Sequence, residues 1–293
     1  MHTRTSHFVR RIYVDIQSEI NYYLEQAIDG KASMSDEVLD KFAERCRHAM
    51  DRQFNSKEDK FTIRMSSIGK PLCQQQLEKE GAKAGRPDPA LKMKFAFGDI
   101  VEAITMAVME AGKVNIEEFQ KEVDYELGPI KIKGTLDVIV DSKVYDIKSA
   151  SSFQFKKKFA KEDGIQRVLQ DDPFGYVSQG YLYGEASGKP FGGWIVVNKE
   201  TGEIVVCNTP ERGEAYKRKA VGDARKNAIA LESDLPFERC FGPVPNTYYN
   251  KPTGEMRLDV VCSYCKFKET CWGDEIEFRK SRKGSSYKWF FKG

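Results

Sequence analysis

The sequence predicts an α/β protein in which a mixed central β-sheet is flanked by helices. Residues 130–140 alternate apolar and polar side chains, as a half-buried strand does. Residues 192–198 and 203–208 are rich in apolar residues and surround a Glu-Thr-Gly turn, which is typical of a strand hairpin. Residues 91–112 and 210–231 are expected to be helices, the first amphipathic and the second highly charged.

The chain of 293 residues can hold one large core, or one domain with a smaller appendage. We expect three parts: a helical extension over 1–59, a main domain over 60–275 and a basic, aromatic tail over 276–293. In the extension, residues 8–30 are expected to form a docked helix because apolar side chains recur at helical spacing. These side chains are Val9, Ile12, Ile16, Ile20, Tyr23, Leu24 and Ala27. A second helix is expected from about Asp36 to Arg52, followed by a polar linker at Asn55–Asp59.

The amphipathic helix within 91–112 carries one acidic residue of interest, Glu102. Its apolar stripe is formed by Phe97, Ile100, Val101, Ile104 and Val108. Glu102 lies near the edge of that stripe, one turn after Gly98. The position is compatible with a solvated glutamate or with a carboxylate that faces a site.

Asp137, Asp146 and Lys148 form the constellation that points most clearly to chemistry. The strand over 130–140 is followed by a turn at 141–143 and a second strand, in which Asp146 and Lys148 share one face. If the two strands pair, Asp137 reaches the same face. Two neighbouring carboxylates repel each other unless a divalent cation lies between them, and oxygen ligands suit Mg²⁺ or Mn²⁺. The alternative is a surface hairpin with solvated charges.

A cysteine cluster, VCSYCKFKETCW at residues 261–272, is the second strong signal. Its thiols are Cys262, Cys265 and Cys271, with C-x2-C-x5-C spacing, and three thiols this close indicate a metal centre. A fourth ligand is needed to complete a zinc or iron–sulfur shell. Cys73 is the best candidate, within a short helix that we expect Ser66 or Ser67 to cap. The other cysteines are Cys46, Cys207 and Cys240. Structural zinc and reduced buried thiols are the alternatives.

The order of these motifs resembles that of a known family. Gly134-Thr-Leu-Asp137, eight residues and Asp146-Ile-Lys148 are similar to the signature of the PD-(D/E)XK nuclease superfamily. A lone cysteine before this signature and C-x2-C-x5-C after it resemble the iron–sulfur branch of RecB-like nucleases. That branch includes CRISPR-associated exonucleases, AddB-type subunits and many phage exonucleases. The resemblance covers about residues 60–275 and implies a restriction-endonuclease-like fold.

The resemblance implies two cofactors. A [4Fe–4S] cluster would be held by Cys73, Cys262, Cys265 and Cys271, and would join distant parts of the chain. One or two Mg²⁺ or Mn²⁺ ions would be bound by Glu102, Asp137 and Asp146, with the Ile147 carbonyl as a further ligand. Lys148 would then help to position the nucleophile.

Candidate substrate contacts lie downstream. Gln179 and Tyr183 share one helical face and resemble the family's Q-x-x-x-Y motif, which implies contact with DNA; a core-packing tyrosine is the alternative. A run of three lysines that begins with Lys156 and Lys157 is expected to contact phosphates. Lysines and aromatic residues in 276–293 could track a nucleic-acid backbone and stack on bases, although a charge run is usually a solvated face.

The function that the resemblance implies is that of a metal-dependent DNA exonuclease, in recombination, replication or degradation of phage or mobile-element DNA. Because no P-loop motif is present, DNA with a free end and a helicase, recombinase or single-strand-binding protein are the expected partners. The three histidines all lie in the first 48 residues, which argues against a histidine-based nuclease. A non-catalytic DNA-binding subunit that keeps the fold is the alternative, and a zinc-stabilised adaptor is a weaker one.

Composition limits the remaining choices. The net charge is only +3, so a nucleic-acid surface must arise from local clustering of basic residues. No stretch approaches the roughly 20 apolar residues of a membrane span. The first residues, MHTRTSHFVRR, lack the apolar core of a signal peptide. We therefore expect a cytoplasmic protein, in the host cytoplasm if phage-encoded, with reduced cysteines and no membrane partner.

Overall fold

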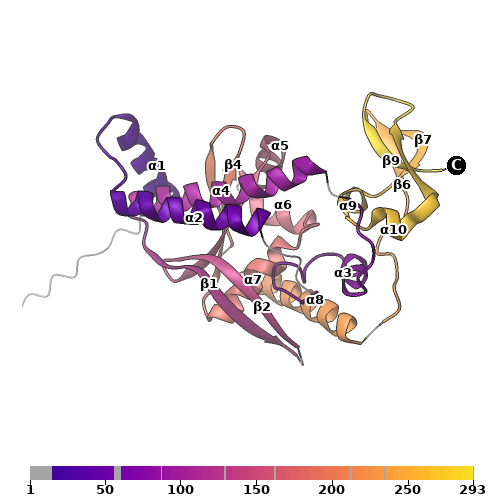
Figure 1. Cartoon of the computed structure of the whole chain (residues 1–293), viewed down its shortest axis with the longest axis horizontal. Coiled ribbons are helices and arrows are strands. Elements are labelled where there is room, and N and C mark those ends of the chain that lie inside the picture. The colour runs from indigo at the N-terminus through magenta and orange to yellow at the C-terminus, as the bar shows by residue number, and fades with distance from the viewer. Residues whose placement is uncertain are drawn as a thin grey trace, which may run out of the picture.

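The computed structural model describes residues 15–55, 61–86, 88–128, 130–161, 163–210, 213–233 and 235–292. It is a mixed α/β structure with a five-stranded sheet flanked by helices, which confirms the predicted fold class (Figure 1). The strands of this sheet are β1 Ile116–Leu127, β2 Ile130–Val140, β3 Lys143–Ala150, β4 Phe191–Asn198 and β5 Ile204–Asn208.

The five strands follow the order β1-β2-β3-β4-β5, and only β3 and β4 run parallel. β2 and β3 form the predicted hairpin, with Val138 opposite Tyr145. Its turn consists of Asp141 and Ser142, whose φ angles of 46° and 61° are those of a two-residue turn that matches strand twist. The parallel step from β3 to β4 requires a crossover, which the helices between them supply.

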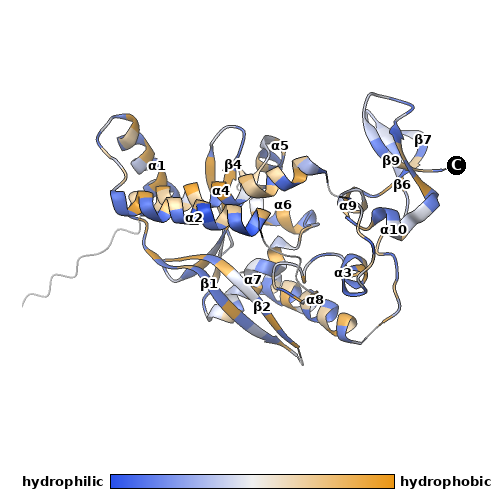
Figure 2. Cartoon of the chain, in the orientation of Figure 1, coloured by the Kyte–Doolittle hydropathy of each residue, from blue (hydrophilic) through white to orange (hydrophobic). Residues whose placement is uncertain are grey.

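Helices cover both faces of the five-stranded sheet. α1 and α4 pack on the face that carries Val138 and Val140, and α2 lies along α4. α7 and α8 pack on the opposite face, which carries Ile139, because its side chain alternates with those of Val138 and Val140; Leu136 also belongs to this core. Figure 1 shows the helices on either side of the sheet, and Figure 2 shows many apolar residues along α4. The bounds are α1 Ile16–Ile28, α2 Asp36–Phe54, α4 Pro89–Ala111, α7 Tyr176–Ser187 and α8 Glu214–Glu232.

The helical extension agrees with expectation over the part that is described. α1 begins at Ile16 after Asp15, whose side chain accepts the Ser18 N–H. Residues 8–14 of the expected first helix lie outside the described residues, as do 56–60, which include most of the expected linker. No helix in the described ranges is long and apolar enough to cross a membrane.

Shorter elements connect the layers. The helix that contains Cys73 begins at Leu72 after Pro71 and has no side-chain cap, so the predicted capping by Ser66 or Ser67 is wrong. Four residues, 68–71, separate the serines from the helix, and the Ser67 hydroxyl instead donates to the Arg64 carbonyl. The remaining bounds here are α3 Leu72–Lys79, α5 Ser152–Gln154, the π-helical turn η1 Phe155–Phe159 and α6 Gly164–Gln170.

The last part of the chain forms a second sheet, of order β6-β7-β9-β8. Residues 276–293 are therefore no separate tail: they provide β8 and β9, and Phe290 of β9 pairs with Arg257 of β7. The bounds are β6 Val244–Tyr248, β7 Lys251–Arg257, α9 Val260–Tyr264, α10 Lys268–Trp272, η2 Gly273–Glu275, β8 Ile276–Lys280 and β9 Tyr287–Phe291. The expected boundary at 275/276 cuts through this sheet.

A buried carboxylate holds the second sheet together. Glu255 of β7 forms an ion pair with Arg279 of β8 at 2.6 Å and accepts hydrogen bonds from the Ser281 hydroxyl at 3.2 Å and the Arg282 N–H at 3.2 Å. Burial alone would raise the pKa of Glu255, but these partners lower it to about 2. The charged pair thus ties β8 to β7.

Candidate active site and cysteine cluster

Asp137 of β2 and Asp146 of β3 lie on neighbouring strands just beyond the paired residues Val138 and Tyr145. The Ile147 N–H donates to Asp137 Oδ2 at 2.7 Å, so the Asp137 carboxylate reaches across to β3. Lys148 Nζ lies 2.7 Å from both carboxylate oxygens of Asp146. The hairpin therefore brings the three predicted residues together, as the alternation of strand side chains indicated.

The Asp146 carboxylate is fully buried, at 0% exposure. Its Oδ1 accepts hydrogen bonds from Lys148 Nζ and, at 3.4 Å, from Gln179 Nε2. Its Oδ2 is equally close to the ammonium but receives no hydrogen bond of acceptable geometry within the described residues. The Lys148 ammonium therefore supplies the positive charge that both buried carboxylate oxygens face.

Negative charge dominates this part of the structure. Burial raises the pKa of Asp137 well above its ordinary range, and Asp146 and Glu102 raise it further. Burial would lower the pKa of Lys148, but Asp146 and Asp137 outweigh burial and raise it, so Lys148 remains a cation. Three carboxylates therefore share one lysine, an arrangement that a divalent cation would neutralise.

Glu102 approaches the two aspartates from α4. The Gln120 amide donates to Glu102 Oε1. Burial raises the pKa of Glu102, and Asp99 and Asp146 act in the same direction, whereas Arg52 and Lys148 oppose them. The carboxylate thus faces the site, and the expectation of a purely solvated side chain is excluded.

Gln120 belongs to the site although nothing in its sequence context indicated it. The β1–β2 register places it opposite Asp137, between the pairs Phe119–Val138 and Lys121–Leu136. Its φ of 47° is unusual for a residue other than glycine. The irregular backbone turns the side chain toward Glu102, which a strict strand alternation does not predict.

Gln179 and Tyr183 of α7 lie behind the carboxylates. The Gln179 amide is 3.3 Å from the Tyr183 hydroxyl and also contacts Asp146. Tyr183 is only 2% exposed and packs against Gly134, where an added Cβ would lie 2.6 Å from the tyrosine ring. Gly134 thus permits α7 to pack closely on β2. Tyr183 is largely a core side chain whose hydroxyl helps to position Gln179.

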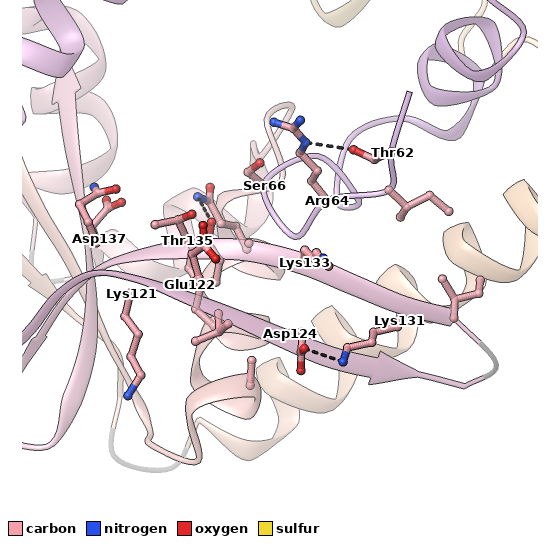
Figure 3. Close-up of a pocket in the computed structure, with 18 of the residues that line it drawn as sticks. Thr62, Arg64, Ser66, Lys121, Glu122, Asp124, Lys131, Lys133, Thr135 and Asp137 are labelled. Atoms are coloured by element: carbon pink, nitrogen blue, oxygen red, sulfur yellow. Dashed lines mark hydrogen bonds and ion pairs between the residues drawn. The ribbon is translucent and has the colours of Figure 1, made fainter. Parts of the chain in front are cut away.

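Asp137, Glu102, Gln179 and Tyr183 line one end of a hollow of about 1850 Å³. Figure 3 shows that it continues along the β1–β2 ribbon past Thr135 to the hairpin's far end. Its lining is mixed in charge. The basic side chains are Arg52, Arg64, Lys79, Lys121, Lys131 and Lys133, and the acidic ones beyond the site are Glu78, Asp99, Glu122, Asp124 and Glu232.

The predicted lysines Lys156 and Lys157 do not line this hollow. Lys157 forms an ion pair with Asp171 at 3.0 Å, and the buried Lys158 contacts the same carboxylate at 3.1 Å. An aromatic residue lies beside the site: the Tyr176 ring centroid is 5.2 Å from Lys148 Nζ. Sequence reasoning gave Tyr176 no role.

The four predicted cluster cysteines come together although Cys73 is distant in sequence. Cys73 of α3 lines one small cavity with Cys262, Cys265 and Cys271 from the α9–α10 region. The space between them is about 20 Å³, close to that of one water molecule. A four-iron cluster would therefore require these side chains to move apart.

A fifth thiol lies beside this group. The Cys73 N–H donates to Cys240 Sγ at 3.1 Å. The preceding residue, Arg239, fixes this segment, because it pairs with Glu275 at 2.7 Å and lies 4.0 Å from the Trp272 ring centroid. Hydrogen bonds from the Cys73 thiol and backbone lower the pKa of Cys240 to about 6. The sequence favours Cys73, and not Cys240, as the fourth ligand.

In the described part of the chain, no group of three or more His, Cys, Asp or Glu side chains is arranged to hold a metal ion. At the carboxylate site the donors are neighbours, but Lys148 lies against Asp146 and the Ile147 N–H occupies Asp137. The donor types suit a hard divalent cation, and the cysteines suit zinc or an iron–sulfur cluster. Binding in either place would require small side-chain movements.

No protein-family model and no curated protein matches this chain. Solved structures that resemble it distantly include the following two. SSO0001 has a TM-score of 0.44 and 16% identity, covering 78% of this chain and 95% of that one. A putative exonuclease from Eubacterium rectale has a TM-score of 0.34 and 18% identity, covering 75% of this chain and 88% of that one. Likenesses this distant leave the function of this chain to be argued from its own residues.

Proposed function

We propose that this chain is a metal-dependent deoxyribonuclease of the PD-(D/E)XK, RecB-like type, which hydrolyses phosphodiester bonds. One observation carries the proposal: Asp137 and Glu102 line one end of a hollow that is large enough for a nucleic-acid strand, and Asp146 with its partner Lys148 lies beside Asp137 on the neighbouring strand. A surface hairpin with solvated charges would not bury Asp146 completely.

The three carboxylates would hold Mg²⁺ or Mn²⁺, with the Ile147 carbonyl as a further ligand by resemblance. When bound, the metal supplies Lewis-acid activation of water and neutralises charge on the phosphate. Lys148 keeps its proton beside the two aspartates, so its ammonium can orient the attacking water and stabilise charge that develops on the phosphate oxygens. For this it must turn from Asp146 toward the substrate.

Gln179 and Gln120 act as positioning residues in this proposal. Each amide donates to one carboxylate, Gln179 to Asp146 and Gln120 to Glu102. Such hydrogen bonds orient metal-binding carboxylates and keep their free oxygens directed into the site. The Tyr183 hydroxyl in turn restrains Gln179.

The finer parts of the proposal rest on the resemblance of motif order. They are exonucleolytic action on DNA with a free end, a [4Fe–4S] cluster on the four cysteines, and a role in phage or mobile-element DNA metabolism. A helicase, recombinase or single-strand-binding protein would be the partner that supplies or opens the DNA.

The test uses pure full-length protein and end-labelled DNA in linear single-stranded, linear double-stranded and circular forms. Each substrate is incubated with Mg²⁺, Mn²⁺ or EDTA, beside the Asp146→Asn variant. We expect cleavage of linear DNA with either metal, none with EDTA and little by the variant. Mononucleotide or short products from the labelled end would support an exonuclease. Tight DNA binding without cleavage under any condition would instead support a non-catalytic DNA-binding subunit.

A further inference from the structure

The second sheet presents three aromatic side chains on one face, formed by β8 and β9. Phe278 pairs with Trp289 and Lys280 pairs with Tyr287, so these four side chains share that face. The Phe278 ring centroid is 5.3 Å from that of Trp289 and 5.8 Å from that of Tyr287. Phe278 and Tyr287 are 58% and 62% exposed. We call Phe278, Tyr287 and Trp289 the aromatic face.

Only one end of this face contributes to a core. Ile276 and Phe291, which share the face, pack with Trp272 and Leu258, and Trp289 borders this small cluster. Phe278 and Tyr287 lie outside this cluster, and their rings remain largely exposed to solvent. Adjacent large aromatic rings that remain this exposed mark an interaction surface more often than a packing defect.

Two basic side chains, Lys268 and Lys280, lie at the aromatic face. Lys268 Nζ lies 5.5 Å from the Trp289 ring centroid, and Lys280 lies beside Tyr287 on the same face. Residues 276–292 contain six lysines and arginines, of which Arg279 and Lys288 point to the opposite face of the sheet, as does the one carboxylate side chain, Glu277. The positive charge of Arg279 is neutralised by its ion pair with Glu255 of β7, whereas Lys280 forms no ion pair within the described residues. The face therefore combines exposed rings with net positive charge.

We propose that the aromatic face binds single-stranded nucleic acid, with bases stacked on the rings and phosphates near Lys268 and Lys280. Every base has a π-face, so such a surface accepts any sequence, and basic side chains attract the backbone. A duplex keeps its bases stacked on one another and cannot use the rings. The inference deepens the proposed function by naming single-stranded nucleic acid as the substrate class, and it rests on that function.

The aromatic face and the carboxylate site are separate parts of the molecule. Figure 1 shows the second sheet beyond α9 and α10, whereas the hollow follows the β1–β2 ribbon below α4. A long strand can contact both regions, and a very short oligonucleotide can occupy the hollow alone. Loss of the rings should therefore weaken the binding of long strands without changing the hydrolysis step.

The experiment measures binding of fluorescently labelled oligo(dT), oligo(U) and a duplex of equal length to the full chain, in EDTA so that no cleavage occurs. The variants are Phe278→Ala and Tyr287→Ala, singly and combined. Tyr22→Ala is the matched control, because Tyr22 in α1 is also an exposed tyrosine, at 65%. We expect single-strand binding on the order of ten-fold weaker for each ring removed, with the control unchanged. The oligo(dT) and oligo(U) arms show whether DNA or RNA is preferred.

Intrinsic fluorescence gives a second, direct readout. Trp194 and Trp272 are buried, so quenching by oligo(dT) should come from Trp289 and disappear in Trp289→Phe. Equal affinity of wild type and the double variant for single strands, failure of wild type to bind them, or a preference for duplex would overturn the inference.

Cleavage of a thymidine tetranucleotide with Mn²⁺ separates this inference from the proposed function. Unchanged tetranucleotide cleavage by the double variant, with weaker oligo(dT) binding, is the expected result. A wild type that binds through the rings but cuts nothing would overturn only the proposed hydrolase. A double variant that loses tetranucleotide cleavage while its oligo(dT) binding is unchanged would overturn the inference.

Discussion

Lys148 Nζ lies 2.7 Å from the carboxylate of Asp146, a side chain with no exposed surface. A buried ion pair of this kind contributes little net stability, because desolvation of both charges offsets their attraction. Its retention beside two further carboxylates, Asp137 and Glu102, is therefore better explained by chemistry than by folding. Because the Asp146 side chain is completely buried, any replacement of Asp146 also needs a control for folding stability.

The charge of Asp137 gives a prediction about stability and pH. Because burial and the neighbouring carboxylates raise its pKa in the folded chain, ionising it opposes folding. This cost is absent at pH 4 or below and grows as the pH rises through the folded-state pKa. In EDTA, Asp137→Asn should therefore have the same melting temperature as wild type near pH 4. At pH 8 its melting temperature should be higher than that of wild type, by about 2–4 °C for each kcal/mol of destabilisation that the substitution removes.

Divalent metal should reverse that order. Mn²⁺ at pH 8 should raise the melting temperature of wild type by mass action and leave that of Asp137→Asn nearly unchanged. Differential scanning fluorimetry across pH, with and without metal, measures both effects. A variant that is less stable than wild type at pH 8 in EDTA would contradict the assigned pKa direction.

Gly134 is predicted to be irreplaceable for a steric reason. A Cβ there would lie 2.6 Å from the Tyr183 ring and 3.1 Å from Met65 Cβ, so α7 would have to move away from β2. Gly134→Ala should destabilise the chain by about 1–3 kcal/mol, as overpacking does, and should lower activity through Gln179. Gly222→Ala is the control, because a Cβ at this α8 position meets nothing and removes a helix-weakening glycine. Chemical denaturation of both variants measures the difference, and equal stability would contradict the packing account.

The cysteine group gives a prediction about metal content. Protein purified without oxygen should contain iron and acid-labile sulfide near four each per chain, as a four-thiolate cluster implies. Cys73→Ala should lose this metal, whereas Cys46→Ala, in α2, should keep it. Cys240→Ala tests which thiol is the fourth metal ligand, because Cys240 lies against Cys73. Metal lost from Cys240→Ala but kept in Cys73→Ala would reassign the ligand, and stoichiometric zinc would replace the cluster proposal.

The hairpin and the layers were predictable because their signals are local. Alternation along 130–140 and the Asp141–Ser142 turn determine which face Asp137, Asp146 and Lys148 share. Helical periodicity likewise located α4 and the described part of α1. The approach of Glu102 to Asp146 came only from resemblance, since no local pattern relates α4 to β3.

The features that sequence reasoning missed depend on contacts between distant segments. Gln120 reaches Glu102 through an irregular strand residue, and Cys240 reaches Cys73 because Arg239 binds Glu275. The residues after 275 looked like a tail because their partner strand, β7, has a mixed composition. Pairing of Arg257 with Phe290 cannot be inferred from either segment alone.

The central claim is that the Asp146 and Lys148 pair serves metal-dependent hydrolysis. The most direct measurement is single-turnover cleavage of end-labelled linear DNA with Mn²⁺ by wild type, Asp146→Asn and Lys148→Ala. Circular dichroism and metal-free DNA binding serve as controls for folding. We predict a loss of roughly 10²–10³-fold or more in the cleavage rate for both variants, with near-normal DNA affinity. Variants that fold and cut DNA at the wild-type rate would contradict the account.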